Sequence, residues 1–287
     1  MEVLDGSSSV SASSDGATPP NILGGHPSNN TGGSTVKGVT ISGGGGDSGG
    51  DSDSSNKASA DFATIGGGNT NEASADFATI GGGKFHTASG TNATIAGGLF
   101  NKATTNDATV GGGTTNEASG QYATIPGGRN NIADGSDSFA AGRDAETNGK
   151  NGAFVWGDSS KTAVTASAAN EVVFQASGGM RVGSASDMST GVELSSGGGS
   201  WSSLSSKTAK SDIEPVNGPD ILEAVDSLDI ATWRYDTEDE DIRHMGPMAE
   251  DFYDVFSLGD DERRITNVDA DGVALAAIKG LSEKLDE

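Results

Sequence analysis

A serine and a lysine that could together cleave a peptide bond stand five positions apart, at Ser205 and Lys210, in the segment SWSSLSSKTAK. A lysine of lowered pKa can take the proton of a serine hydroxyl and turn it into a nucleophile. Free lysine has a pKa of about 10.4, so folding must desolvate such a lysine or place another cation beside it. Lys207 is the candidate for that cation. Because this spacing also arises by chance, its meaning depends on the elements on either side.

The composition is that of a repetitive, acidic chain. With 45 glycines, 33% hydrophobic and 5% aromatic residues, it has too few large apolar side chains for one ordinary globular core. The absence of cysteine excludes disulfides and thiolate metal sites, and we expect neither a cofactor nor a metal. The net charge of −24 argues against nucleic acid or anionic membranes as partners. Residues 211–287 carry 22 acidic and 6 basic side chains, a net of −16, and such a surface suits a high-salt environment.

The sequence also bears on where the protein is located. No apolar run is long enough to span a membrane, so we expect no membrane insertion. The start, MEVLDGSSSV, lacks the basic and apolar regions of an ordinary signal peptide. We therefore expect a virion, extracellular or cell-surface location reached by another route, such as virion assembly and lysis. Residues 1–54 are rich in Gly, Ser and Asp and predict a disordered arm.

From residue 56 the chain repeats with a period of 15, as in NKASADFATIGGG followed by NEASADFATIGGG. Glycines and Asn-x-Ala supply turns, and ATI supplies a short strand with Ala and Ile pointing inward. One coil cannot bury its own apolar side, so coils stack in parallel at about 4.7–4.9 Å. The sequence predicts a β-solenoid of seven coils over 55–160, whose thin core favours lateral, most simply threefold, association. His86 takes the Asn position of one repeat and is interpreted as a turn variant, not a metal ligand.

This pattern resembles the head repeats of trimeric autotransporter adhesins. The resemblance implies a mainly β protein, a left-handed parallel β-roll in a trimeric fibre. Residues 161–204 then read as a β-rich stalk or connector, with short runs VVF, MRV and VEL between glycine turns. They resemble the closing β-region of phage tail fibres.

Residues 205–287 resemble the intramolecular-chaperone, self-cleaving serine peptidase domain at the C-termini of phage endosialidases, tailspikes and neck appendages. The parts that carry this resemblance are residues 205–210, a helix over 221–228, a Trp/Tyr strand over 232–235, the segment 243–251 and a helix over 271–285. It implies a small α+β domain ending in a helix that brings three chains together in a short coiled coil. It also implies a single-turnover serine endopeptidase with a Ser–Lys dyad.

Two serines compete for the family's nucleophile. Ser211 precedes an aspartate, as in the family pattern, but no lysine stands five positions further on. Aligning the surrounding segments instead places the serine at Ser205 and the lysine at Lys210, with cleavage between Ser205 and Ser206. The chain departs from the family pattern at Ser206, where Asp is usual, and at Lys207, where Arg is usual. Arg243 and His244 match the family's Arg-His, which implies a supporting role.

Three functions remain open at this stage. The first is a homotrimeric fibre or tailspike-like attachment protein that releases its own chaperone and meets a host-surface or virion partner. The second is a purely structural adhesin that retains the chaperone uncut. The third, a carbohydrate-cleaving enzyme, needs paired carboxylates, and the repeats offer few carboxylates and no aromatic platform for a sugar.

Overall fold

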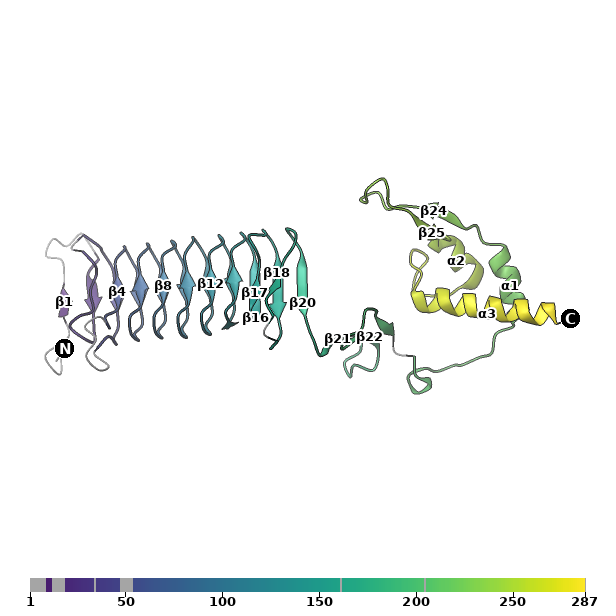
Figure 1. Cartoon of the computed structure of the whole chain (residues 1–287), viewed down its shortest axis with the longest axis horizontal. Helices are drawn as coiled ribbons and strands as arrows, with labels where there is room; N and C mark the ends of the chain where they lie inside the picture. Colours follow the sequence, from purple (N-terminus) through teal and green to yellow (C-terminus); the bar gives the residue numbers. More distant parts are fainter. Residues whose placement is uncertain are drawn as a thin grey trace. The chain divides into compact units, whose positions relative to one another are not determined.

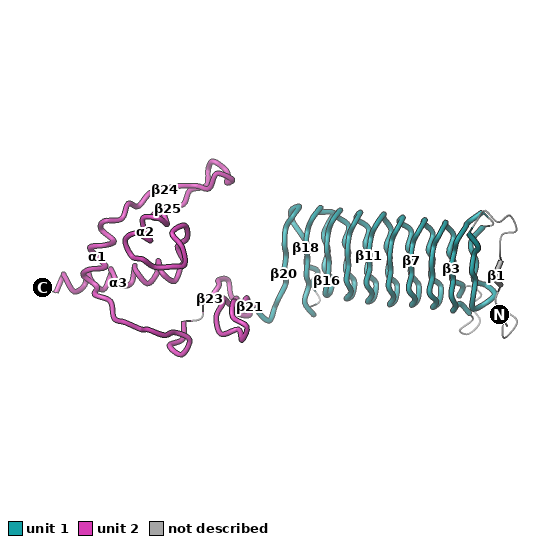
Figure 2. The backbone as a smooth tube through the Cα atoms, turned by 180° about the vertical axis from the view of Figure 1, so that it is seen from behind, with its two compact units in different colours: residues 1–179 teal, residues 180–287 magenta. Residues whose placement is uncertain are grey.

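The computed structural model describes residues 9–11, 19–33, 35–46, 54–160, 162–203 and 205–286. The chain forms two compact units, Met1–Gly179 and Met180–Glu287 (Figure 2). The first is a β-solenoid, seen as a row of stacked coils in Figure 1, and the second holds a small sheet, a hairpin and three α-helices. The mainly β fold, the solenoid and the small α+β region ending in a helix are confirmed, whereas the left-handed turn and the trimer stay predictions.

Two parallel ladders run along the solenoid and pair residues of the same repeat position. Thr79 pairs with Thr94 in one ladder, and Glu72 pairs with Thr87 in the other. The first ladder joins β2 (Asn21–Leu23), β3 (Thr40–Ile41), β5 (Thr64–Ile65), β7 (Thr79–Ile80), β9 (Thr94–Ile95), β11 (Thr109–Val110), β13 (Thr124–Ile125), β16 (Phe139–Arg143), β18 (Phe154–Gly157) and β20 (Val172–Gln175). At its start β1 (Ser9–Ser11) pairs antiparallel with β2, and β14 (Gly128–Arg129) pairs with β16. The second joins β4 (Lys57–Ala58), β6 (Glu72–Ala73), β8 (Thr87–Ala88), β10 (Lys102–Ala103), β12 (Glu117–Ala118), β15 (Ile132–Ala133), β17 (Ala145–Glu146) and β19 (Val164–Thr165).

The solenoid extends beyond both expected boundaries. Within the expected disordered arm, β2 and β3 pair in parallel and β3 continues onto β5, with Val39 and Ile41 fully buried. The rest of that expectation, over 1–8, 12–18, 34, 47–50 and 51–53, lies outside the described residues. At the other end, β19 and β20 belong to the solenoid and not to a separate stalk. About ten coils therefore replace the seven that the period predicted.

Buried asparagines form a ladder inside the coils, at the position that precedes each core alanine by two. Asn116 Nδ2 donates to Gly112 O at 2.8 Å and to Gly128 O at 3.1 Å, and Asn116 Oδ1 accepts the Asn131 N–H at 3.0 Å. Glycine is required beside it, because a Cβ on Gly113 (φ +86°) would collide with Gly128 O and lie 2.8 Å from Asn116 Nδ2. The repeat's Asn and Gly are thus parts of one hydrogen-bonded corner. The buried residues at this position are Asn56, Asn71, His86, Asn101, Asn116 and Asn131. Asn29 precedes Thr31 instead of an alanine, and it extends the ladder by accepting the Asn56 N–H.

Two other corners of each coil between residues 56 and 144 hold non-glycine residues at φ near +60°, a conformation that bulky side chains rarely adopt. Some coils place the usual Asn or Asp there, as at Asn92 and Asp107. Other coils place aromatic residues there and leave them exposed: Phe62, Phe77, Phe85, Phe100 and Tyr122. Phe62 stacks on Phe77 at 5.1 Å between ring centroids, and Phe85 on Phe100 at 4.7 Å. The repeats therefore expose stacked aromatic rings, which were not foreseen, because the sequence gives no sign of which side of a coil these rings face.

The second unit begins with a three-stranded sheet of β21 (Gly179–Gly183), β22 (Gly191–Ser195) and β23 (Ser202–Ser203). A short 3₁₀ turn, η1 (Lys207–Ala209), follows. The helices are α1 (Gly218–Asp226), α2 (Ala249–Phe256) and α3 (Asn267–Leu285), and β24 (Ala231–Trp233) pairs antiparallel with β25 (His244–Gly246). Helix α3 starts earlier than the expected 271, because the Thr266 side chain accepts the Asp269 N–H and caps it.

Helices α1 and α3 touch through their backbones. A Cβ on Gly218 would lie 2.8 Å from Gly280 N, and a Cβ on Gly280 would collide with the Gly218 carbonyl. Figure 1 shows α1 lying against α3 at this point. On α3 the side buried by this packing holds Val273, Ala277 and Gly280.

Candidate functional site

The structure brings Ser205 and Lys210 into direct contact. Lys210 Nζ lies 2.8 Å from Ser205 Oγ. The η1 turn produces this approach: the Lys210 N–H bonds to Lys207 O, so the chain folds back on itself after Ser206. The Ser206 side chain caps the turn by accepting the Thr208 N–H at 3.3 Å, and its Oγ lies 2.8 Å from Thr208 Oγ1. A five-residue spacing thus closes into a local dyad without help from a distant element.

For base catalysis, Lys210 would have to be the neutral acceptor of the serine proton, and in this contact its Nζ is the donor and Ser205 Oγ the acceptor. Ser205, Ser206, Lys207 and Lys210 are all exposed in the single chain. Burial against another surface is the physical change that would favour the neutral amine. Lys207 opens η1, and none of the described contacts joins its side chain to Lys210.

His244 belongs to an aromatic cluster on the β24–β25 hairpin. Its Nε2 lies 3.0 Å from Glu238 Oε2, and its ring centroid lies 4.7 Å from that of Trp233. The backbone N–H of Tyr235 also donates to Glu238 at 2.9 Å and, with a smaller effect from His244, lowers the pKa of this carboxyl. None of the described contacts links the cluster or the exposed Arg243 to Ser205 or Lys210, so a supporting role for Arg243 and His244 stays a prediction.

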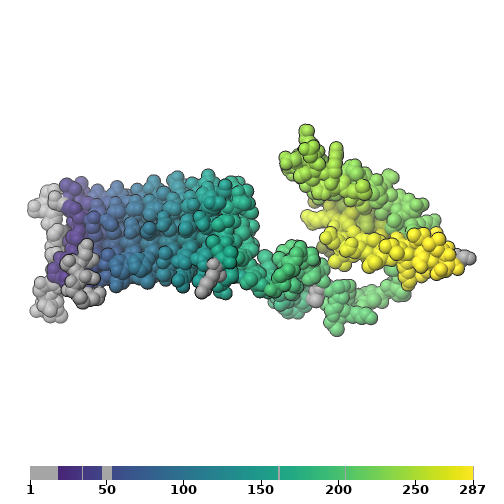
Figure 3. Space-filling model, in the orientation of Figure 1, coloured from purple at the N-terminus to yellow at the C-terminus, as the bar shows by residue number. Residues whose placement is uncertain are grey.

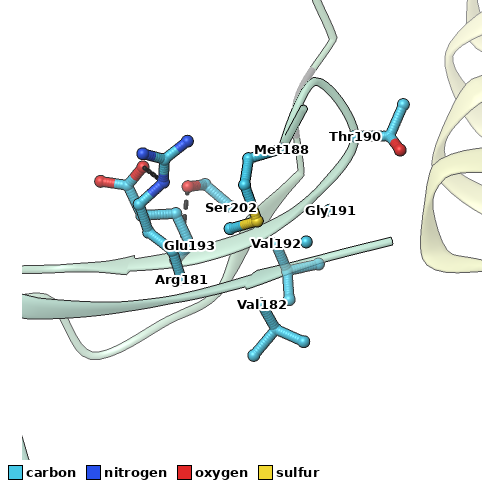
Figure 4. A pocket seen from close by; sticks show the side chains of 9 residues that line it. Arg181, Val182, Met188, Thr190, Gly191, Val192, Glu193 and Ser202 are labelled. Atoms are coloured by element: carbon cyan, nitrogen blue, oxygen red, sulfur yellow. Dashed lines mark hydrogen bonds and ion pairs between the residues drawn. The ribbon is translucent and has the colours of Figure 1, made fainter. Parts of the chain in front are cut away.

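A small cavity lies in the sheet that precedes the dyad (Figure 4). It has a volume of about 60 Å³ and is lined by Val182, Met188 and Val192 together with polar neighbours. Arg181 Nε pairs with Glu193 Oε2 at 3.6 Å, and Ser202 Oγ donates to Glu193 O at 3.1 Å. Because these polar groups bind one another, the cavity reads as packing between strands and holds none of the candidate catalytic residues.

His86 stands at the corner where the repeats place asparagine, as expected of a turn variant, and it is buried there within the ladder. It is 1% exposed and takes the place of a buried asparagine. Its backbone N–H donates to Asn71 Oδ1 at 3.1 Å, and its ring Nδ1 accepts the backbone N–H of Asn101 at 3.0 Å. Burial lowers the pKa of His86, against the opposing effect of hydrogen bonds with Gly98 and Asn101. Among the described residues no group of three or more His, Asp or Glu could hold a metal ion.

Comparison with protein families identifies the C-terminal segment. Residues 205–258 match the model of a peptidase family described as chaperone of endosialidase. The chain carries a chaperone-of-endosialidase domain. The match begins at Ser205, so it contains the dyad, the hairpin cluster and α2. None of the curated proteins compared with the chain matches it. None of the described helices is long and apolar enough to cross a membrane.

Joined to a β-solenoid, a chaperone-of-endosialidase domain supports a protein of the fibre or tailspike type. The matched family is a peptidase family, and the atoms that could carry out self-cleavage are Ser205 Oγ and Lys210 Nζ. The sequence pointed to Ser205 and Lys210 from the family pattern. It gave no signal for the cap that Ser206 forms, because that depends on the turn at 207–209.

Proposed function

We propose that this protein is a trimeric attachment fibre whose chaperone-of-endosialidase domain guides assembly and then releases itself by one cut between Ser205 and Ser206. The observation that carries the proposal is the 2.8 Å contact of Lys210 Nζ with Ser205 Oγ at the start of the matched segment. A virion or cell-surface location, and a host-surface or virion partner, belong to the same proposal.

Association through α3 is supported by an apolar side that the second unit leaves uncovered. Val268, Leu275, Ile278 and Leu285 repeat at spacings of seven and three along α3, with exposed fractions of 51%, 69%, 64% and 78%. This stripe lies opposite the side that packs on α1, and Figure 3 shows α3 open to solvent along its length. A heptad stripe of this kind is buried when helices pair in a coiled coil. Other copies of the same helix are the occupants we propose.

A fibre of identical coils gains from such a clamp. Coils with the same sequence can pair out of register, and long-range β pairing is slow. Joining three chains at one end raises their effective concentration and fixes the register, after which the solenoids close from the C-terminal side. Cleavage then removes the clamp, so that unfolding is not reversed and the fibre is kinetically stable.

Assembly also supplies the condition that the dyad lacks in the single chain. Packing of neighbouring copies over Lys210 would desolvate its amine and favour the neutral form that can accept a proton. Cutting then depends on completed assembly. The alternative, a structural adhesin that retains its chaperone, is favoured by the exposure of the dyad in the single chain.

Intact mass spectrometry of the purified full-length chain tests the proposal, with native gel mobility before and after boiling as a report on association. We expect two fragments that meet between Ser205 and Ser206, and a boiling-sensitive trimer. Ser205→Ala and Lys210→Ala should each slow the cut by at least about 100-fold. An uncut chain in a fully assembled trimer would establish the retained-chaperone alternative, and unchanged cutting in both variants would exclude the dyad.

A further inference from the structure

The last coils of the solenoid turn large apolar side chains to the outside. Successive side chains of a strand alternate between its two faces, and Val155 in β18 is fully buried, so Phe154 and Trp156 face outward. The pairing register adds the matching positions of β16 and β20. Figure 1 shows these three strands side by side at this end of the coils. We name their outward residues the aromatic patch: Phe139, Phe154, Trp156, Val172 and Phe174.

The side chains of the patch contact one another and remain open to solvent. The ring centroids of Phe139 and Phe154 lie 4.6 Å apart with the planes 3° from parallel, and the ring of Phe174 lies 5.4 Å from that of Phe154. Trp156, Val172 and Phe174 are 36%, 62% and 48% exposed. Contiguous exposed apolar side chains of this size mark an interaction surface. Because the stacked pair leaves no gap between its rings, the patch is suited to apolar packing and not to a sugar inserted between ring faces.

The outward row to which the patch belongs carries no charge in the coils that the structure describes. It is one continuous register of threonines followed by patch residues: Thr40, Thr64, Thr79, Thr94, Thr109, Thr124, Phe139, Phe154 and Val172. The corresponding row of the second ladder is charged, with Lys57 paired to Glu72 at 3.0 Å and Lys102 to Glu117 at 3.5 Å. Copies of a chain with a net charge of −24 repel one another, so of the two rows the uncharged one lets them approach more closely.

We propose that the aromatic patch is the surface through which copies of the solenoid pack against one another. The inference rests on the proposed trimer and names the part of the solenoid that holds it together. The occupant is a second copy, because its outward row has the same coil spacing and the same lack of charge, so that the two rows can run alongside each other. Around a threefold axis every copy can turn the same residues inward, which brings patch against patch. The patch lies in the last coils, where the proposed closure from the C-terminal side starts.

Fluorescence of Trp156 in the full-length chain tests the inference with the patch unchanged. Quenching by acrylamide measures access to the indole, and Trp156→Phe identifies the share of the emission that comes from this residue. In the trimeric parent the quenching should be at least about twofold weaker than in the monomer produced by Leu275→Lys with Ile278→Lys on α3, because a packed interface excludes the quencher. Equal quenching of Trp156 in trimer and monomer would overturn the patch as an interface and leave it to a host-surface ligand, while the trimer stands. A parent that is monomeric in light scattering would overturn the proposed trimer and this inference with it.

Lysines placed in the patch give a second test, measured by sedimentation of the full-length chain over a dilution series. Val172→Lys combined with Phe174→Lys should raise the protein concentration at which the trimer dissociates by at least about 100-fold, since two exposed apolar side chains lose their burial. Glu146→Lys is the matched control, because it changes the net charge by the same amount on the outward row of the second ladder, and it should associate like the parent. Association of the double variant at the strength of the parent would overturn the inference. Equal weakening by Glu146→Lys would overturn it too, since charge and not the patch would then be the cause.

Discussion

At the scale of single residues, His86 shows how histidine in place of a ladder asparagine changes the hydrogen bonds of one corner. Each ladder asparagine has an amide that donates twice, as Asn101 Nδ2 does to Gly97 O and Gly113 O. His86 Nδ1 accepts a hydrogen bond, so in the neutral ring only Nε2 carries a proton. Nε2 is buried and makes no hydrogen bond within accepted geometry to any described residue, whereas the Nδ2 of Asn101 in the next coil donates to two carbonyls.

His86→Asn should complete the ladder and stabilise the solenoid by about 1 kcal/mol at pH 7, measured as a rise in the denaturation midpoint. The parent should also depend on pH in a way the variant does not. The folded pKa of His86 is lowered, so its neutral form is favoured above the unfolded value of about 6.5, and this stability is lost as the pH falls below it. Parallel stability profiles of parent and variant between pH 7 and pH 5 would contradict this account.

Tyr122 illustrates a second loss of stability at this scale, the backbone strain of an aromatic residue with positive φ. Its φ is +60°, its side chain is 53% exposed, and the same corner one coil earlier holds Asp107. Tyr122→Asn should therefore stabilise the solenoid by about 1 kcal/mol, because asparagine tolerates this conformation better. Tyr122→Ala, which keeps the unfavourable Cβ, is the control and should give no gain. Equal denaturation midpoints for the two variants would show that backbone strain is not the cause.

At the scale of elements, the repeat period was enough to predict the central coils and their inward residues. It failed at the ends, where coils are longer: Ile41 pairs with Ile65, and Gly157 pairs with Gln175. A search for a fixed period misses such coils, although their ladders continue without a break. The pair Ser205 and Lys210 was predicted from the resemblance to the family pattern, and the local turn η1 is what brings the two side chains together. The start of α3 was missed because it depends on Thr266, whose side chain accepts a backbone N–H.

The crossing of α1 and α3 gives a prediction for the chaperone domain. Gly280→Ala should destabilise this unit by about 1–3 kcal/mol, because its Cβ would meet the Gly218 carbonyl and lie 2.7 Å from Pro219 N. Gly272→Ala is the matched control in the same helix, since a Cβ there meets no atom within 4 Å. That variant should gain about 0.5–1 kcal/mol from helix propensity. Thermal unfolding of both variants measures the difference, and a shift of the same sign in both would refute close packing at the crossing.

At the scale of the whole molecule, the proposed assembly rests on α3 presenting two different apolar sides. One is used within the chain, against α1, and the other carries Leu275 and Ile278, which are 69% and 64% exposed. The acidic charge of residues 211–287 opposes association of copies, so apolar burial must exceed that repulsion. Raising the salt concentration should therefore strengthen the trimer by screening.

Leu275→Lys combined with Ile278→Lys separates apolar association from charge. Both substitutions reduce the net negative charge, so a purely electrostatic account predicts a tighter trimer. We expect a monomer instead, measured by light scattering after size exclusion, because two apolar side chains of the stripe are lost. Glu283→Lys changes charge in the same direction outside the stripe and should stay trimeric. The monomeric double variant should also fail to cut, since nothing then covers Lys210. Cutting by a monomer would show that assembly does not control the dyad.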